Sequence, residues 1–314
     1  MNRYLFLLIL IWLNSAVLAQ NESVENTFAL CIAAPQADRL DEFVAFINEE
    51  VGPKGINTLI LRVDFNYAFQ SYPNLRDDDP LTDADIKKIV SVAKKHDIEL
   101  IPQINLLGHQ SWAETTYALL RTYPEFDETP HIAMPEEYVW PNKDGLYCRS
   151  YCPLHPGVHE VVFALIDEIV DVFESRSFHA GMDEVFYLGD SLCVRCSGKE
   201  KASLFAGEVT RIRDHLADND ITLWIWGDRL IDAEASGLGI WEASGNETAA
   251  AIHLIPKDVI VNDWHYNDAV PTPAYFATNG LSVVSCFWNK PEVARSHMEM
   301  MRFLKETSPT PMNQ

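Results

Sequence analysis

The sequence predicts an α/β fold, a (β/α)8 TIM-type barrel that is incomplete at its C-terminal end, with about seven βα units present. Three observations predict it. Short apolar runs alternate with amphipathic stretches, as they do where parallel strands are joined by crossover helices. The 314 residues, 47% of them hydrophobic, can bury one large core and have the length of a single barrel domain. Carboxylates, histidines and tryptophans gather where the apolar runs end, and barrels of this class carry their functional residues at those places.

The predicted strands are the apolar runs at 28–34, 57–65, 99–106, 178–183, 222–226, 259–264 and 282–288. Between them, apolar residues recur at three- and four-residue spacing, which predicts helices at 38–51, 82–96, 158–173, 204–217 and 291–304. Thr82 followed by Asp85 resembles a capping box, and Pro291 suits the start of the last helix.

One strand of a closed barrel is missing from this pattern, and the deficit lies at the C-terminus. Only 308–314 follow the last helix, and Pro309 and Pro311 suit an extended approach better than a complete strand. We expect either a truncated chain, which we favour, or an open barrel. The longest irregular segment, 122–156, precedes the fourth strand and is expected to form an active-site loop.

The N-terminal residues predict an exported protein. Arg3, the apolar run 5–13 and the small residues at 17–19 are typical of a signal peptide at 1–19, followed by a short lead at 20–27 and the barrel at 28–314. The apolar run is shorter than the ~20 residues that span a bilayer, so a membrane anchor is the weaker interpretation. The mature protein is therefore expected to be secreted or periplasmic, with no membrane contact.

The charge of the chain excludes one class of partner. Asp and Glu outnumber Lys and Arg by 46 to 24, a formal net charge of -22, whereas phosphate binding needs cationic side chains. We therefore expect no nucleic acid and favour a neutral substrate. The acidity also fits a solvated surface that keeps an exported protein soluble. The oligomeric state is not predicted.

The six cysteines allow two interpretations. In an exported chain, Cys148 with Cys152 and Cys193 with Cys196 predict disulfides, which we favour. The same four thiols could hold structural zinc, although neither pair has the tight knuckle sequence of a zinc ribbon. Cys31 and Cys286, in apolar strand-like runs, are expected to be inert core residues.

The strand ends supply the candidate site residues, in chain order Asp64; Asn105 and His109; His179, Asp183 and Glu184; Trp226 and Asp228; Asp263, Trp264 and His265; and Trp288 with Asn289. Adjacent carboxylates and several tryptophans at one rim suit a carbohydrate, because indole faces stack on sugar rings while carboxylates act on the glycosidic oxygen. No cofactor and no metal are expected in catalysis. A cation held by His179, Asp183 and His109 is a weaker idea, because no local metal-binding spacing supports it.

Each candidate also has an ordinary structural explanation. An Asp-Glu pair at a strand end is commonly a helix cap or a solvated loop. His109 and His179 could be satisfied core histidines, and any one Trp is more often core packing than a sugar platform. Asp228 and Asp263 could cap or form ion pairs with Arg229 or Lys290.

Several segments together point to a known family. The run 178–184, Phe-His-Ala-Gly-Met-Asp-Glu, resembles the His-x-Gly-Gly-Asp-Glu signature of the family-20 glycoside hydrolases, the β-N-acetylhexosaminidases. The run 101–109 is similar to that family's third-strand Pro-Glu-x-Asp-x-Pro-Gly-His segment, and 224–228 to its Trp-containing fifth-strand segment. Cys152 and Pro153 open a helix that leads to the motif, as in the family. The similarity spans most of 28–288.

The resemblance implies a substrate-assisted retaining mechanism, in which Glu184 is the general acid and base and Asp183 orients the substrate's 2-acetamido group as nucleophile. Physical reasoning agrees, because two neighbouring carboxylates disfavour joint ionisation and the pKa of one rises toward neutrality. We expect the remaining strand-end candidates to bind the substrate. These are His109, His179, Trp226, Trp264 and Trp288, together with Asp64, Asp228 and Asp263.

The sequence also departs from the family pattern. Met182 replaces the second Gly of the signature, Gln103 and Asn105 replace acidic residues, and Pro35 with Gln36 stand where the family has an Arg. We also expect these 314 residues to contain neither the α+β domain that precedes the barrel in the family nor its eighth strand. Three functions are therefore weighed: a hydrolase for terminal β-linked N-acetylhexosaminides, a barrel hydrolase for another sugar with Asp64 or Asp228 as nucleophile, and a carbohydrate-binding barrel without catalysis.

Overall fold

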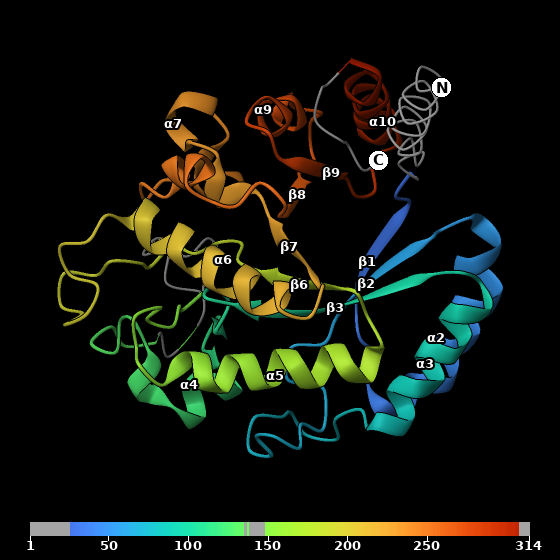
Figure 1. Cartoon of the computed structure of the whole chain (residues 1–314), viewed down its shortest axis with the longest axis horizontal. Coiled ribbons are helices and arrows are strands. Elements are labelled where there is room, and N and C mark those ends of the chain that lie inside the picture. The colour runs from blue at the N-terminus through green and yellow to red at the C-terminus, as the bar shows by residue number, and fades with distance from the viewer. Residues whose placement is uncertain (1–25, 135–136, 138–147, 308–314) are drawn as a thin grey trace, which may run out of the picture.

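The computed structural model describes residues 26–134, 137 and 148–307 of the chain (Figure 1). The predicted signal peptide, most of the lead, part of the segment 122–156, and Pro309 and Pro311 lie outside the described residues.

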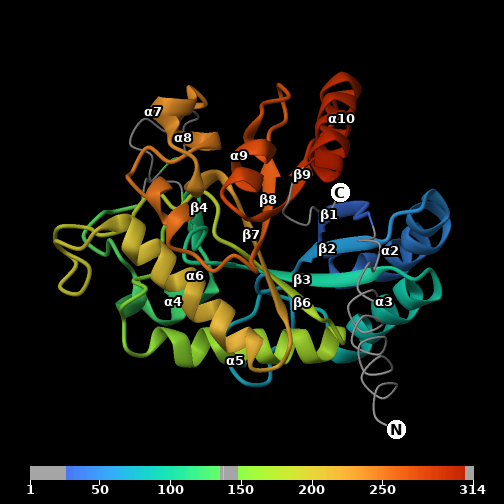
Figure 2. The ribbon, with the colours of Figure 1, turned by 45° about the horizontal axis from the view of Figure 1, so that its top comes forward.

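A seven-stranded parallel sheet forms the centre of the molecule. Its strands are β1 (Ala29–Ala33), β2 (Thr58–Arg62), β3 (Glu99–Leu106), β6 (Ser177–Gly181), β7 (Thr222–Trp226), β8 (Ile260–Trp264) and β9 (Ser282–Cys286), and each pairs with the next in chain order. All seven predicted strands are therefore confirmed. The sheet curls but does not close in the described part of the chain, so β1 and β9 are its two edges (Figure 2). The incomplete (β/α)8 barrel is the observed architecture.

Helices lie along the outside of the curled sheet, as the periodicity predicted (Figure 1). The main ones are α2 (Leu40–Phe46), α3 (Asp83–Lys95), α5 (Val158–Phe173), α6 (Lys201–Ala217), α9 (Thr272–Thr278) and α10 (Pro291–Thr307). Of these, only α9 was not predicted from the sequence. The predicted capping box is confirmed: Asp85 N donates to Thr82 Oγ1 at 3.3 Å, and Thr82 N donates to Asp85 Oδ2 at 3.0 Å. None of the helices in these described ranges is long and apolar enough to cross a membrane.

The short elements were not predicted, because they lack a periodic pattern long enough to recognise. They are the hairpin β4 (Ser111–Trp112) and β5 (Thr115–Thr116), the helices α4 (Ala118–Thr122), α7 (Ala233–Ser236) and α8 (Gly239–Glu242), and the 3-10 helices η3 (Gly52–Lys54), η4 (Pro124–Phe126), η5 (Asp228–Leu230) and η6 (Ala249–His253). Apart from η3, they lie in segments that follow the carboxyl ends of strands. The helix predicted at 38–51 is divided into the 3-10 helix η1 (Ala37–Arg39), α2 and the π-helix η2 (Ile47–Val51).

The two edge strands differ from the interior strands in burial. Residues 58–61 of β2 are all buried, and so is every residue of β6, because these strands have neighbours on both sides and helices outside. In β1, by contrast, exposed and half-buried residues alternate. Cys31, expected in the core, is exposed for this reason, and Cys286 on β9 is only half-buried. The core prediction is therefore wrong for Cys31, whereas Cys286 packs against a small cluster of buried core residues.

Candidate active site

The carboxyl end of β6 makes a tight turn that presents the two adjacent carboxylates. Gly181, Met182 and Glu184 all have left-handed backbone conformations, with φ of 66°, 67° and 49°. A Cβ on Gly181 would lie 2.3 Å from Asn105 Oδ1 on β3, so only glycine fits there. Met182 adopts a conformation that glycine tolerates without strain, which is a physical reason for the second Gly in the family signature.

His109 connects the two carboxylates. Its Nε2 lies 3.1 Å from Asp183 Oδ2 and 3.2 Å from Glu184 Oε2, and its Nδ1 lies 3.3 Å from Cys148 Sγ. Burial lowers the pKa of His109, but the charge and hydrogen bonds of its partners raise it well above its usual range. The ring is therefore an imidazolium near neutral pH and supplies a positive charge between two acids.

Asp183 is held in its ionised form by this neighbour. Burial raises the pKa of the carboxyl, but the charge and hydrogen bond of His109 lower it by more, so the net shift is downward. Asp183 Oδ2 faces His109, whereas Oδ1 is buried and accepts no hydrogen bond from the described residues. Asp183 therefore offers a buried, charged acceptor atom that a bound molecule could use.

Asp228 fixes the backbone of the pair. Its Oδ2 accepts a hydrogen bond from Glu184 N at 2.9 Å and another from Arg229 Nε at 2.7 Å. Burial raises the pKa of Asp228 to about 6, although Arg229 opposes that shift. The pairing of Asp228 with Arg229, one of the two sequence-based interpretations, is therefore observed. The hydrogen bond from Glu184 N also places Asp228 against the backbone of the turn that follows β6.

The other two aspartates of the predicted site are tied to the barrel. Asp64 Oδ1 accepts from Asn105 N at 2.8 Å, and burial raises its pKa. Asp263 is 1% exposed, accepts from Thr272 Oγ1 at 2.6 Å, and lies 3.1 Å from His265 Nε2. The proposed partner of Asp263, Lys290, instead donates to Asn267.

His179 is a buried residue of the barrel interior. Its Nδ1 accepts a hydrogen bond from Gly181 N at 3.0 Å, and burial lowers the pKa of the ring to about 3, so it is neutral. Its ring centroid lies 4.7 Å from that of Trp226. His179 thus supports the turn that carries Asp183, and it does not join His109 in a cation site.

Aromatic residues lie at the carboxyl end of β8 and after β9. Trp264 lies 5.3 Å from Tyr266, and Tyr266 lies 5.9 Å from Trp288, measured between ring centroids. Trp288 is 71% exposed, so its ring is available to a ligand. Tyr266 was missed in the sequence; burial raises its pKa, and the nearby charges of Asp183 and Glu184 contribute to that rise. Its only signal was its position directly after the strand-end residues 263–265.

The cysteines are arranged differently from the prediction. The described cysteines are all free thiols. Cys152 Sγ lies 3.7 Å from Cys193 Sγ and 3.4 Å from Cys196 Sγ, far beyond the ~2.05 Å of a disulfide bond. Cys148 lies instead against His109. The predicted pairing of Cys148 with Cys152 is therefore wrong, because the chain places the two thiols in different clusters.

Two groups of side chains in the described ranges have the composition of a metal site. One is His109, Cys148 and Glu184 in the candidate active site, and the other is Glu128, Cys152, Cys193 and Cys196. In the first group the imidazolium already occupies the space between the acids, and its positive charge opposes a cation there.

A curled parallel sheet with two adjacent carboxylates and a row of aromatic rings at its carboxyl edge defines a barrel of the glycoside hydrolase type. Comparison with known sequences gives the family. Residues 66–290 match the model described as the catalytic domain of glycosyl hydrolase family 20. The chain belongs to this family.

Individual relatives agree with the assignment. The chain is 27% identical over 184 residues to a lacto-N-biosidase of Bifidobacterium bifidum, which covers 58% of this chain and 14% of that protein. It is 24% identical over 188 residues to hexosaminidase D of Bos taurus, which covers 57% of this chain and 48% of that protein. The chain thus spans about half or less of the length of these curated relatives.

Solved structures support the fold. A β-N-acetylhexosaminidase from Bacteroides fragilis superimposes with a TM-score of 0.60 at 15% identity, covering 83% of this chain and 51% of that one. A chitobiase from Flavobacterium johnsoniae gives a TM-score of 0.59 at 16% identity, covering 83% and 38%.

Proposed function

We propose that the protein is a glycoside hydrolase that removes terminal β-linked N-acetylhexosamine by a substrate-assisted retaining mechanism. Its substrate is a carbohydrate and its partners do not include nucleic acid. The observation that carries the proposal is the contact of one imidazolium, His109, with both Asp183 and Glu184 at 3.1 and 3.2 Å. This arrangement gives two adjacent acids different tasks.

Asp183 remains ionised because His109 lowers its pKa, so it cannot be the proton donor near neutral pH. Its unpartnered, buried Oδ1 is suited to accept the N–H of a 2-acetamido group and to orient the acetamide oxygen toward the anomeric carbon. Glu184 then protonates the leaving oxygen and later removes a proton from the water that opens the cyclic intermediate. His109 stabilises the negative charge that Glu184 acquires.

The contacts of the other aspartates argue against a hydrolase with a protein nucleophile. Asp228 accepts hydrogen bonds from Arg229 and Glu184 N, and Asp64 accepts one from the backbone of Asn105. Asp263 is buried behind Thr272 and His265. Asp228 and Asp263 also each have a buried Oδ1 without a hydrogen-bond partner among the described residues, but neither contacts His109 as Asp183 does. In the proposed mechanism the substrate's own acetamide supplies the nucleophile without them.

An aryl β-N-acetylglucosaminide is the direct test, because its phenol product is measured continuously. Glu184→Gln and Asp183→Asn should each lower kcat by about 100-fold or more. The exposed Glu234→Gln is the matched control and should leave the rate unchanged. A thiazoline mimic of the cyclic intermediate should inhibit the wild type competitively. Turnover without thiazoline inhibition would indicate a nucleophile other than the substrate's acetamide, whereas sugar binding without turnover by the wild type would indicate a binding protein.

We also propose that the protein acts outside the cytoplasm, on the basis of the signal-like residues 1–19. N-terminal sequencing of the protein recovered from the medium or periplasm of its own host would test this. A mature N-terminus near Gln20 supports export, and a full-length chain confined to the cytosol contradicts it.

A further inference from the structure

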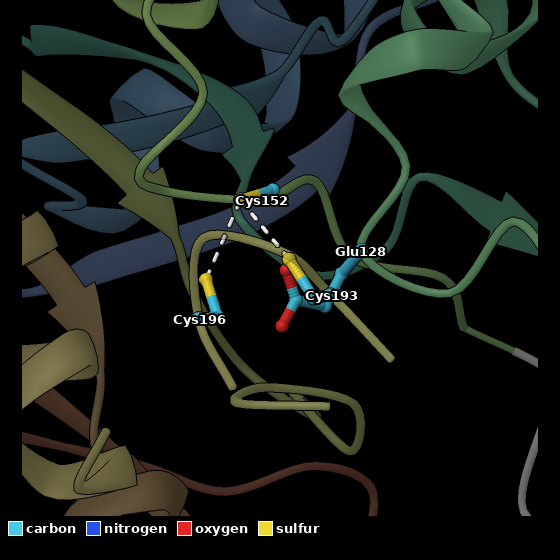
Figure 3. Close-up of side chains that lie close together, drawn as sticks. All are labelled: Glu128, Cys152, Cys193 and Cys196. Atoms are coloured by element: carbon cyan, nitrogen blue, oxygen red, sulfur yellow. Dashed lines mark hydrogen bonds between the residues drawn. The ribbon is translucent and has the colours of Figure 1, made fainter. Parts of the chain in front are cut away.

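Three thiols and one carboxylate converge in a buried cluster beside the candidate active site, between segments that are far apart in the sequence. Glu128 and Cys152 belong to the segment between β3 and α5, and Cys193 and Cys196 to the loop that follows β6 (Figure 3). Glu128, Cys152 and Cys196 are 0% exposed, and Cys193 is 8% exposed. One ligand atom from each lies within 4.8 Å of every other.

The sulfur positions fit a tetrahedral ion rather than a disulfide. Thiolates bound at ~2.3 Å to a tetrahedral zinc ion lie about 3.8 Å apart. The two sulfur-to-sulfur distances from Cys152 are 3.7 and 3.4 Å. A disulfide would also leave one of the three thiols unpaired beside a buried carboxylate.

Glu128 is the independent observation that points to a cation. Its Oε1 accepts a hydrogen bond from Asp190 N at 3.0 Å, and the Cys193 thiol is hydrogen-bonded to the carboxylate, whereas no described donor has normal hydrogen-bond geometry toward the fully buried Oε2. A buried carboxylate oxygen without a partner is costly, and a bound cation removes that cost. Figure 3 shows the carboxylate among the sulfur atoms.

The backbone around the cluster is arranged for thiolate ligands. The amide of Leu154 donates to Cys152 sulfur, and the amides of Arg195 and Cys196 donate to Cys193 sulfur. Such N–H groups orient metal-bound thiolates and stabilise their charge. The Cys-x-x-Cys spacing of Cys193 and Cys196 places both on one short turn.

We propose that Glu128, Cys152, Cys193 and Cys196 bind one zinc ion in a structural site. Three thiolates and one carboxylate fill the four positions of a closed tetrahedral site, so no position remains for water or substrate, and thiolates select zinc over harder cations. Binding displaces the three thiol protons. The ion would cross-link the loop that begins at the catalytic pair to the segment preceding α5, and so fix the rim of the site.

The metal content of the full chain, purified without chelators, tests the proposal independently of any glycosidase activity. Mass spectrometric metal analysis should find about one zinc per chain in the wild type. Cys196→Ser should retain less than about a tenth of it, because three ligands bind zinc far more weakly than four. The matched control Cys31→Ser, which removes a cysteine outside the cluster, should keep the full amount.

Replacing zinc by cobalt in the wild type reports directly on the metal ligands. It therefore tests the proposed site even if Cys196→Ser does not fold. Cobalt bound here should show intense thiolate charge-transfer absorption and the visible bands of a tetrahedral site. The proposal is overturned if the folded wild type stays metal-free after incubation with zinc, or if mass analysis finds a disulfide among the three thiols. It is also overturned if Cys196→Ser keeps its zinc while Cys148→Ser loses it, which would place the ion beside His109.

Discussion

Replacing His109 by Gln separates the charge of this residue from its size and hydrogen-bonding capacity. Two unit charges 3.1 Å apart attract by about 5 kcal/mol at an effective dielectric constant of ~20. The two side chains are 13% and 19% exposed, so solvent screens part of this attraction, and about 2 to 3 kcal/mol is a reasonable net value. Since ~1.4 kcal/mol is a factor of ten, kcat/KM should fall by about 30- to 150-fold at acidic pH.

The pH dependence of this loss follows from the direction of the Asp183 shift. His109 lowers the pKa of Asp183 and burial raises it, so removing the imidazolium leaves burial unopposed and the pKa of Asp183 rises. Asp183 is then protonated over a wider acidic range. The acidic limb of the kcat/KM profile should therefore move to higher pH, and the loss of rate should shrink as the pH increases.

Hydrolysis of an aryl N-acetylglucosaminide across the pH range measures both effects. The exposed His253→Gln is the matched control and should keep the wild-type profile. A His109→Gln profile within twofold of wild type at every pH would refute the idea that this imidazolium holds Asp183 in its charged form. A uniform loss at all pH values would mean that His109 acts through Glu184 or through the local fold and does not set the pKa of Asp183.

Three further substitutions test the scaffold and the rim. Gly181→Ala places a Cβ 2.3 Å from a β3 side chain and should lower the free energy of unfolding in urea by more than ~3 kcal/mol. Gly55→Ala, also at positive φ but in open space, should lower it by only about 1 kcal/mol. Equal losses would contradict the idea that close packing against β3 requires glycine at 181. Arg229→Met leaves Asp228 buried without its cation and should destabilise by about 3 to 5 kcal/mol, so a change below ~1 kcal/mol in the same assay would refute it. Trp288→Ala should change stability by less than about 0.5 kcal/mol because the ring is 71% exposed, but should raise KM for an aryl chitobioside several-fold, and an unchanged KM would remove Trp288 from the site.

The sequence predicted the strands well because each is a short, strongly apolar run between recognisable helices. The run 99–106 coincides with β3, and 222–226 with β7. The short elements after the strands were missed, since their conformations depend on tertiary contacts. Thr248, for example, stabilises the loop after β7 by donating to Arg229 O at 2.8 Å, a contact between residues that no local pattern relates.

The sequence predicted which residues form the candidate site but not which side chains contact one another. The sequence indicated that Asp183, Glu184 and His109 lie at neighbouring strand ends, and parallel pairing of β3 with β6 brings them together. It could not indicate that Cys148 contacts His109, because the spacing of Cys148 to Cys152 suggested a pair. Nor could it show that Asp263 is buried behind Thr272, since a strand-end position does not fix the direction of a side chain.

The strained turn at the end of β6 accounts for the many contacts that hold the backbone of Asp183 and Glu184, the candidate catalytic residues. Met182 and Glu184 have φ of 67° and 49°, and a non-glycine residue in this region carries strain of about 1 kcal/mol or more. Such strain persists only where the surroundings over-determine the backbone. Asp228 accepts from Glu184 N, and the Gly181 amide is bonded to His179, so the turn is held on both sides of the strained residues. The proposed zinc ion at the cysteine cluster would hold the far end of the loop that follows β6. Removing the zinc with a chelator should therefore make the positions of Asp183 and Glu184 less well defined, although both residues remain in the protein.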